Sequence, residues 1–345
     1  MEDEVPFYVP WFRVRPMADP ELRKDPVVER WVIVSTDRLS RTHELHAAAA
    51  VSRLESCPFC AGHEHLTLPA TLEIPNERDG WRVRVVPNMF PAVRGDGEPQ
   101  TWSDGWHEGT RGVGVHEVVI ECPQHETSLA NLPADHLADL LRAYGQRIQQ
   151  ARHDPRLAYP MIFKNSGADA GASLEHAHSQ ILILPQVPRT VQEELDGAKR
   201  YHESVGRCLF CDWWRQEQVA GERQLLDTTR FTAFLPYAGR FPFEMCILPK
   251  AHASHFEELA EEELAELGEV LRLALRKLQS GLNDPPYNYL LHTAPLAAGP
   301  LPHYHWHLEV LPRITGVAGF EWGTGYFVNP VPPEQAAEYL RGVAI

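Results

Sequence analysis

The chain has 345 residues, enough for two domains, and its hydrophobic and charged fractions of 43% and 23% are ordinary for a globular protein. A formal net charge of −15 argues against general binding to nucleic acid or to anionic lipid, and no apolar run approaches the ~20 residues of a membrane span. Residues 1–4 contain neither the basic nor the apolar part of a signal peptide, so we expect a cytoplasmic protein without nucleic-acid or membrane partners.

Along the chain, apolar and alternating runs predict strands, and apolar residues at helical spacing predict helices. The predicted strands are residues 31–35, 81–87, 114–122, 159–165, 176–184, 231–236, 241–249, 287–292 and 303–312. The predicted helices are residues 133–153, 190–204, 257–280 and a short segment from Pro333. Residues 1–30, 95–112 and 316–329 are rich in Pro, Gly or aromatic residues and are predicted to be irregular. This mixture indicates an α+β fold.

The order of these elements repeats. Each half has a C-x-x-C turn, then strands, a histidine after a strand that ends in proline, a helix, and a strand with paired histidines. Nearly equal spacing separates the matching histidines in the two halves. We interpret this as an internal duplication of one α+β unit, with domains at residues 1–190 and 191–345.

Each half also contains two cysteines and two histidines, a frequent ligand set for tetrahedral zinc. The first set is Cys57, Cys60, His125 and His176, and the second is Cys208, Cys211, His252 and His305. A closed shell of four protein ligands favours a structural ion. Two alternatives stay open: each cysteine pair could be a redox pair or free thiols, and His116 and His303 lie close enough in sequence to replace His125 and His305.

The strand at residues 176–184 carries the candidate catalytic groups. Side chains alternate along a strand, so His176, His178 and Gln180 should share one face, beside the Gly-rich segment 165–173. If His176 binds metal, His178 is free to attack phosphorus, and Gln180 could stabilise the charge that develops on the phosphate. Arg38, Arg41 and Lys164 would offset phosphate charge. The alternatives are strand histidines satisfied by hydrogen bonds and cations that are merely solvated.

Several motifs together resemble the galactose-1-phosphate uridylyltransferases of the histidine-triad superfamily. They are Cys57-x-x-Cys60-Ala61-Gly62, Asn88-x-Phe90-Pro91-Ala92, Asn165-x-Gly167, His176-x-His178-x-Gln180, Pro242-Phe243-Glu244 and Leu248-Pro249-Lys250-Ala251-His252. The resemblance implies a duplicated histidine-triad-like fold, a homodimer, and ping-pong transfer of a nucleotidyl group through His178. It also implies the substrate-binding residues Arg38, Arg41, Asn88, Phe90, Asn165, Gly171 and Ser173, with Gln180 as a further phosphate contact.

The sequence departs from that family pattern in two places. The enterobacterial type builds its second metal site from one glutamate and three histidines, which match Glu194, His292, His305 and His307. This chain also has Cys208 and Cys211, which resembles the plant ADP-glucose phosphorylase branch and supports two Cys₂His₂ zinc sites. In addition, Met89 stands where the uridylyl enzymes have an aspartate, and a glutamate that contacts the hexose is replaced near Gly325. These changes leave undetermined which nucleotide base and which sugar the protein binds.

Three functions follow as hypotheses. The first is a UDP-glucose–hexose-1-phosphate uridylyltransferase with nucleotide sugar and sugar 1-phosphate as substrates. The alternative is an ADP-glucose or other NDP-sugar phosphorylase that uses the same histidine intermediate and takes phosphate as acceptor. The third is a zinc-stabilised binding module without turnover. The pattern does not assign a role to His307 and Glu309, which occupy the positions in the second half that match His178 and Gln180.

Overall fold

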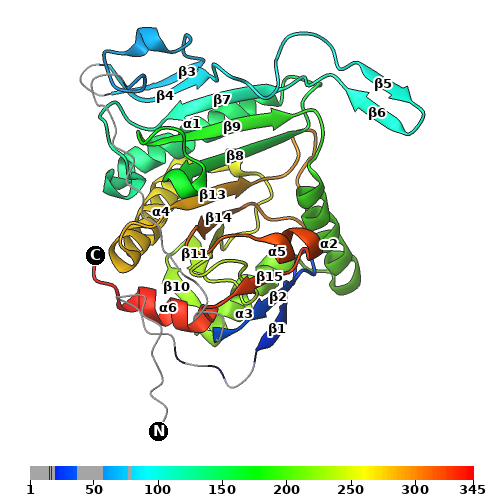
Figure 1. The fold of residues 1–345 in the computed structure, drawn as a ribbon, viewed down its shortest axis with the longest axis vertical. Coiled ribbons are helices and arrows are strands. Elements are labelled where there is room, and N and C mark those ends of the chain that lie inside the picture. The colour runs from blue at the N-terminus through cyan, green and yellow to red at the C-terminus, as the bar shows by residue number, and fades with distance from the viewer. Residues whose placement is uncertain (1–14, 16, 18–19, 37–56, 77–79) are drawn as a thin grey trace.

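A computed structural model describes residues 15, 17, 20–36, 57–76 and 80–345. Its main feature is one ten-stranded sheet in the order β10-β11-β12-β14-β13-β8-β9-β7-β4-β3, with every neighbouring pair antiparallel (Figure 1). The strands are β3 (Leu72–Pro75), β4 (Trp81–Pro87), β7 (Val115–Ile120), β8 (Tyr159–Ser166), β9 (His178–Leu184), β10 (Gln224–Asp227), β11 (Phe231–Phe234), β12 (Met245–Pro249), β13 (Tyr287–His292) and β14 (His307–Pro312).

The two halves of the chain each supply five neighbouring strands of this sheet. They meet where β8 pairs with β13, for example Asn165 with Asn288. The strand order in one half mirrors the order in the other about this pair. The repeat seen in the sequence is therefore built as two α+β units that share one continuous sheet.

Helices cover both faces of the sheet. The α-helices of the described ranges are α1 (Ala134–Ala151), α2 (Arg189–Val205), α3 (Leu209–Ala220), α4 (Glu261–Leu282), α5 (Gly319–Thr324), which lies beside β15, and α6 (Pro333–Gly342). Along β12, Met245 and Ile247 join the core formed with α1 and α4, whereas Cys246 and Leu248 join a second core with α2 and α3. This alternation follows from the pleat of the strand. None of the helices in the described ranges is both long and apolar enough to cross a membrane.

Helices α1 and α4 are matching elements of the two halves and pack directly on each other. Gly268 permits this contact, because a Cβ atom there would lie 2.7 Å from the carbonyl oxygen of Ala134. Real Cβ atoms do not approach backbone oxygens that closely, so a larger residue would force the helices apart. The two packed helices, one from each half, cover one face of the sheet, the α1/α4 face.

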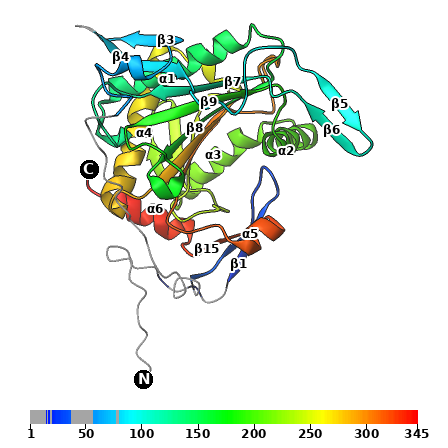
Figure 2. The same ribbon diagram turned by 45° about the horizontal axis from the view of Figure 1, so that its top comes forward.

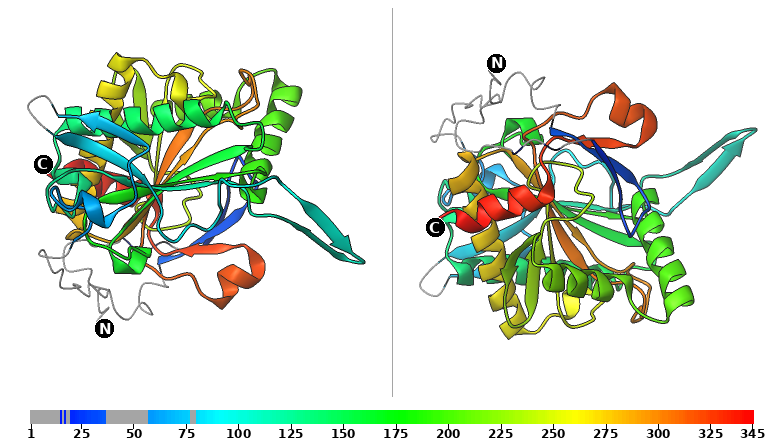
Figure 3. Two further views of the ribbon diagram at one scale, coloured as in Figure 1. Left: turned by 90° about the horizontal axis from the view of Figure 1, so that it is seen from above. Right: turned by 90° about the horizontal axis from the view of Figure 1, so that it is seen from below.

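Two smaller sheets lie outside the main one. Strands β1 (Glu21–Lys24) and β2 (Trp31–Val34) form a sheet with β15 (Phe327–Asn329), which pairs parallel to β2. Strand β2, from the first half, and β15, from the second half, thus lie side by side outside the main sheet (Figure 3). Strands β5 (Thr101–Asp104) and β6 (His107–Thr110) form a hairpin that projects from the body (Figure 2).

The predicted helices and strands are present, with ends that differ by a few residues. The segments predicted to be irregular contain β1, the β5–β6 hairpin, α5 and β15, and the second cysteine turn is the start of helix α3, with Cys208 as N-cap and Cys211 in the first turn. The hairpin was missed because its side chains are almost all exposed and show no apolar alternation. Its two-residue loop is Gly105-Trp106, and a glycine with positive φ at the first loop position, here 61°, is nevertheless a typical hairpin signal.

Candidate active site

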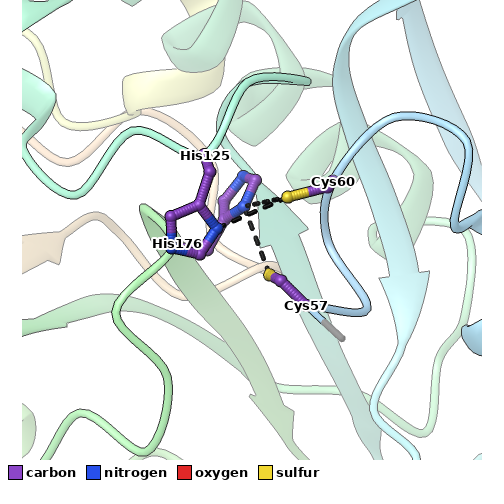
Figure 4. A group of neighbouring side chains, drawn as sticks. All are labelled: Cys57, Cys60, His125 and His176. Carbon is purple, nitrogen blue, oxygen red and sulfur yellow. Dashed lines mark hydrogen bonds between the residues drawn. The ribbon is translucent and has the colours of Figure 1, made fainter. Parts of the chain in front are cut away.

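The first cysteine–histidine cluster joins Cys57, Cys60, His125 and His176, whose ligand atoms lie within 4.8 Å of one another (Figure 4). The sulfur of Cys60 is 3.4 Å from Nδ1 of His125 and 3.7 Å from Nδ1 of His176, and the sulfur of Cys57 is 3.5 Å from the latter. Around a tetrahedral zinc, Zn–S and Zn–N bonds of about 2.3 and 2.0 Å place neighbouring S and N atoms roughly 3.5 Å apart. The four residues therefore fit one tetrahedral ion.

A second cluster joins Cys208, Cys211, His252 and His305. The sulfur of Cys211 lies 3.6 Å from Nδ1 of both histidines. The structure thus brings together both sets predicted from the sequence. His116 and His303, the alternative ligands, lie in neither cluster.

In three of the four clustered histidines, the remaining ring nitrogen contacts a backbone carbonyl. Nε2 of His176 donates to the carbonyl of Cys122 at 2.9 Å, Nε2 of His305 to Pro249 at 2.9 Å, and Nε2 of His252 to Leu301 at 3.0 Å. A proton on Nε2 leaves the Nδ1 lone pair free and fixes the orientation of the ring. Such contacts are typical of metal ligands, and they favour metal binding over free thiols.

Glu194, His292 and His307 form a third group whose ligand atoms also lie within 4.8 Å of one another. His305, the fourth residue of the enterobacterial set, is directed to the cysteines instead. Nδ1 of His292 is 3.1 Å from Glu194, and the rings of His292 and His307 stack with centroids 4.7 Å apart.

Arg240 forms two ion pairs next to this group, in the second half of the chain. Its guanidinium is 2.6 Å from Glu309, the residue that matches Gln180, and 2.9 Å from Glu244. His307 and Glu309 are therefore occupied by stacking and ion pairing within the chain.

His178 lies on the face of β9 that points away from α1 and α4. Its neighbours Ser179 and Ile181 point the other way, where Ser179 contacts the hydroxyl of Tyr144 at 2.6 Å. The predicted shared face of His178 and Gln180 is therefore present. The ring of His178 belongs to no metal cluster and lies 5.4 Å from the ring of Phe59, between centroids.

Nδ1 of His178 donates to the carbonyl oxygen of His176 at 2.8 Å. This contact leaves the lone pair on Nε2, for which the described part of the chain offers no hydrogen-bond partner. Burial, and then the positive charge of Lys164, lower the pKa of His178 below its usual value. The imidazole is therefore neutral at pH 7, as a nucleophile must be.

Lys164 lies on the opposite face of the sheet from the His178 ring. Its ammonium is 2.6 Å from the carboxylate of Glu121 and donates to the backbone carbonyl of His178 at 3.0 Å. The side chains are 1% and 0% exposed. The prediction that Lys164 offsets phosphate charge is wrong, because strand alternation turns it towards the α1/α4 face. From the α1/α4 face, Lys164 supports the backbone of β9 at the carbonyl of His178.

The Gly-rich segment forms a tight loop next to β9. Gly167 and Gly171 have φ angles of 84° and 88°, which favour glycine because a Cβ atom is disfavoured there. The side-chain amide of Asn288 donates to Oδ1 of Asn165 at 2.8 Å and to the carbonyl of Ala170 at 2.9 Å. A residue of β13 in the second half thus supports the predicted phosphate loop of the first half.

The remaining predicted substrate residues are placed as follows. Gly171 and Ser173 are exposed on the loop, and Phe90 is 85% exposed at the tip of the segment after β4. Asn88 and Gln180 both contact His116. Arg38 and Arg41 lie outside the described residues.

Sequence reasoning missed Asn288 and treated His116 only as a possible metal ligand. The local sequence assigns no role to Asn288, since its contact with the loop depends on the pairing of β13 with β8 between the two halves. For His116, the alternating pattern of β7 could have placed it on the same face as Val118, which pairs with Gln180 across the strands.

Comparison with known proteins places the chain in a family. Residues 13–188 match the N-terminal domain, and residues 194–343 the C-terminal domain, of galactose-1-phosphate uridyl transferase. An ADP-glucose phosphorylase from Arabidopsis thaliana is 40% identical over 94% of this chain and 93% of its own length. A galactose-1-phosphate uridylyltransferase from Thermotoga maritima is 31% identical over 93% and 98%, respectively.

Solved structures agree with this assignment. The crystal structure of an Arabidopsis thaliana ADP-glucose phosphorylase with bound ADP-glucose has a TM-score of 0.82 and 38% identity, covering 95% of this chain and all of the other. Both domains of the family match in order, and the chain shares its histidine-triad-like fold with the solved structure. The chain therefore belongs to the galactose-1-phosphate uridylyltransferase family.

Proposed function

We propose that this protein is a nucleoside-diphosphate-sugar phosphorylase that acts on ADP-glucose. The nucleotidyl group would pass first to His178 and then to inorganic phosphate. The higher identity to a relative named ADP-glucose phosphorylase, 40% against 31% for the uridylyltransferase, supports this choice over the uridylyltransferase that we first expected. The second cysteine pair and Met89 point the same way.

The observation that carries the proposal is the state of His178. The ring is neutral, its Nδ1 proton is held by the carbonyl of His176, and its Nε2 lone pair is free. Nε2 attacks the α-phosphorus, and the bond from that phosphorus to the bridging oxygen breaks, which releases glucose 1-phosphate. Positive charge develops on the ring and strengthens the Nδ1–H···O=C contact. Phosphate then attacks the same phosphorus, the N–P bond breaks, and ADP leaves.

The residues around His178 supply the polar groups that this reaction needs. Gln180 would donate to a non-bridging oxygen, and Asn165, Gly171 and Ser173 would contact the phosphates through the tight loop. Arg38 and Arg41 remain the proposed sources of positive charge, since Lys164 is buried in an ion pair. Asn88 and Phe90 would contact the nucleoside.

We assign zinc to both cysteine–histidine clusters, with a structural role. Thiolate and imidazole ligands favour zinc over magnesium or calcium, and four protein ligands leave no position for substrate. In the first cluster, His176 lies two residues before the nucleophile, and its backbone carbonyl accepts a hydrogen bond from Nδ1 of His178. Bound metal would hold this carbonyl, and therefore the ring of His178, in position.

Mass spectrometry of the intact protein tests the proposal. Incubation with ADP-glucose alone should add one AMP group, whereas UDP-glucose should label less protein. Added phosphate should then remove the adduct and yield ADP. His178→Gln should form no adduct while keeping its zinc, and His153→Gln, at an exposed position just after α1, should behave as the parent. Absence of any adduct, or an adduct on His178→Gln, would refute the reaction.

A uridylyltransferase is the second candidate, because a full-length relative with that name is 31% identical and the same imidazole chemistry serves both reactions. It predicts a UMP adduct from UDP-glucose that galactose 1-phosphate removes faster than phosphate does. The same experiment therefore decides between the two donors and the two acceptors.

We also propose that the protein is a homodimer. The β5–β6 hairpin carries Trp102 and Trp106, which are 57% and 100% exposed, and a two-stranded hairpin is at best marginally stable alone. Contact with a second copy would stabilise it. Light scattering should give twice the mass of one chain, and a monomeric mass would contradict the proposal.

The domains at residues 1–190 and 191–345 remain a proposal. The continuous sheet argues that each half buries its β8 or β13 edge against the other. Two separately expressed halves should therefore form a complex on mixing. Halves that are stable and do not associate would contradict the claim that each half needs the other to cover its strand edge.

A further inference from the structure

His116 lies in β7 between the segment that carries Asn88 and the strand that carries Gln180. Its backbone carbonyl accepts from the N–H of Asn88 at 2.9 Å. Its ring contacts three groups: the backbone N–H of Ala92 at 3.0 Å, the side-chain amide of Asn88 at 3.2 Å, and Oε1 of Gln180 at 2.8 Å. None of these contacts involves a residue of the metal clusters.

The contact with Ala92 determines which ring nitrogen of His116 carries the proton. A backbone N–H can only donate, so Nδ1 of His116 must accept and carries no hydrogen. In a neutral ring the proton then lies on Nε2. Nε2 donates to the closest acceptor, which is the amide oxygen of Gln180.

This hydrogen bond determines how the amide of Gln180 is oriented. Its oxygen is held by His116, so its NH₂ group is turned away from the ring. Within the described ranges, no protein acceptor contacts that NH₂ group. An amide in the opposite orientation would place its oxygen, rather than its NH₂, where a phosphate oxygen must bind, and the two oxygens would repel each other.

Asn88 is oriented by the same network. Its Oδ1 accepts from the backbone N–H of Phe90 at 2.9 Å, so its NH₂ group faces Nε2 of His116. Two donors do not bond, and the amide hydrogens of Asn88 are therefore also available to a ligand. The NH₂ group of Asn88 and the amide oxygen of Gln180 thus meet at the same ring nitrogen of His116.

On the basis of the proposed function, we infer that His116 is a positioning residue for nucleotidyl transfer. Through Nδ1 it holds the nucleoside segment at Ala92, and through Nε2–H it orients Gln180 so that an NH₂ group faces the α-phosphate. His116 itself touches neither the phosphorus nor the leaving group. The inference extends the site by one residue and assigns the amide orientation of Gln180.

Two substitutions separate the two nitrogens of the ring. In His116→Asn, the amide oxygen can replace Nδ1 as acceptor for Ala92, but the side chain is too short to reach Gln180. In His116→Gln, a donor remains near the position of Nε2, but the acceptor for Ala92 is lost. The measurement is single-turnover formation of the nucleotide adduct from ADP-glucose over a range of concentrations, with zinc content and melting temperature as checks of folding.

Loss of a direct donor to developing charge typically lowers the rate about 10²–10³-fold, so loss of its orientation in His116→Asn should lower the saturating rate by about 10- to 100-fold. His116→Gln should retain most of that rate but need more ADP-glucose to saturate. If His116 acts through Gln180, His116→Asn should change the rate of Gln180→Ala by no more than about twofold.

A His116→Asn protein that reacts at the parental rate would overturn the inference. So would an equal loss from His116→Asn in the parent and in the Gln180→Ala background, because that result means the two residues act independently. These outcomes differ from failure of the proposed function, in which the parent protein itself would form no adduct.

Discussion

The ion pair between Lys164 and Glu121 allows a quantitative prediction for Lys164→Met. The two side chains are 1% and 0% exposed, and the ammonium lies 2.6 Å from the carboxylate. Removing one partner of a buried pair leaves the other charge uncompensated and typically costs about 3–5 kcal/mol. Tyr289 contacts the same carboxylate at 3.4 Å, which is too long to replace the lost ammonium. We therefore expect the free energy of unfolding to fall by about 3–5 kcal/mol.

A second substitution provides the control. Replacing Glu121 with Gln in the Lys164→Met protein removes the buried negative charge and should recover about half of the lost stability. The remaining deficit should be about 1–3 kcal/mol, because the carbonyl of His178 still lacks the donor that Lys164 supplied at 3.0 Å.

Urea unfolding at pH 7, monitored by tryptophan fluorescence, measures these changes in the parent, both single variants and the double variant. Strong coupling between the two sites is the expected result. A loss below about 1 kcal/mol for Lys164→Met, as measured for solvent-exposed pairs, would refute the argument that this pair is dry. Additive single losses would refute it as well.

Three further predictions concern the site. Because burial and the charge of Lys164 lower the pKa of His178, adduct formation should decline only at a pH below that at which an ordinary histidine titrates, where the ring gains a proton and loses its lone pair; in Lys164→Met the decline should move to higher pH, and an unchanged profile would contradict this cause. Metal analysis should find two zinc ions per chain, one in the Cys208→Ser/Cys211→Ser variant and two in His292→Ala, whereas three ions in the parent would mean that the third group also binds metal. Asn288→Ala should slow adduct formation about tenfold with unchanged zinc content, since it removes the hydrogen bonds that hold the phosphate loop; an unchanged rate would show that the loop is held without Asn288.

The sequence by itself was sufficient for features that depend on local spacing. The two C-x-x-C turns and the repeated histidines identified both clusters and the duplication, because ligand spacing and strand periodicity are properties of short segments. Alternation along residues 178–183 likewise predicted that His178 and Gln180 share a face, and the packing of Ser179 and Ile181 against the opposite core agrees with it.

Features that join distant segments were decided only by the tertiary structure. The pairing of β8 with β13 brings Asn288 to the phosphate loop, and the register of β7 against β9 brings His116 to Gln180. Lys164 was taken for a phosphate contact, because the sequence does not show that Glu121 lies beneath it. The sequence gives the chemical groups of each side chain. Which residue a side chain contacts depends on strand register, and register is set by the packing of the whole core.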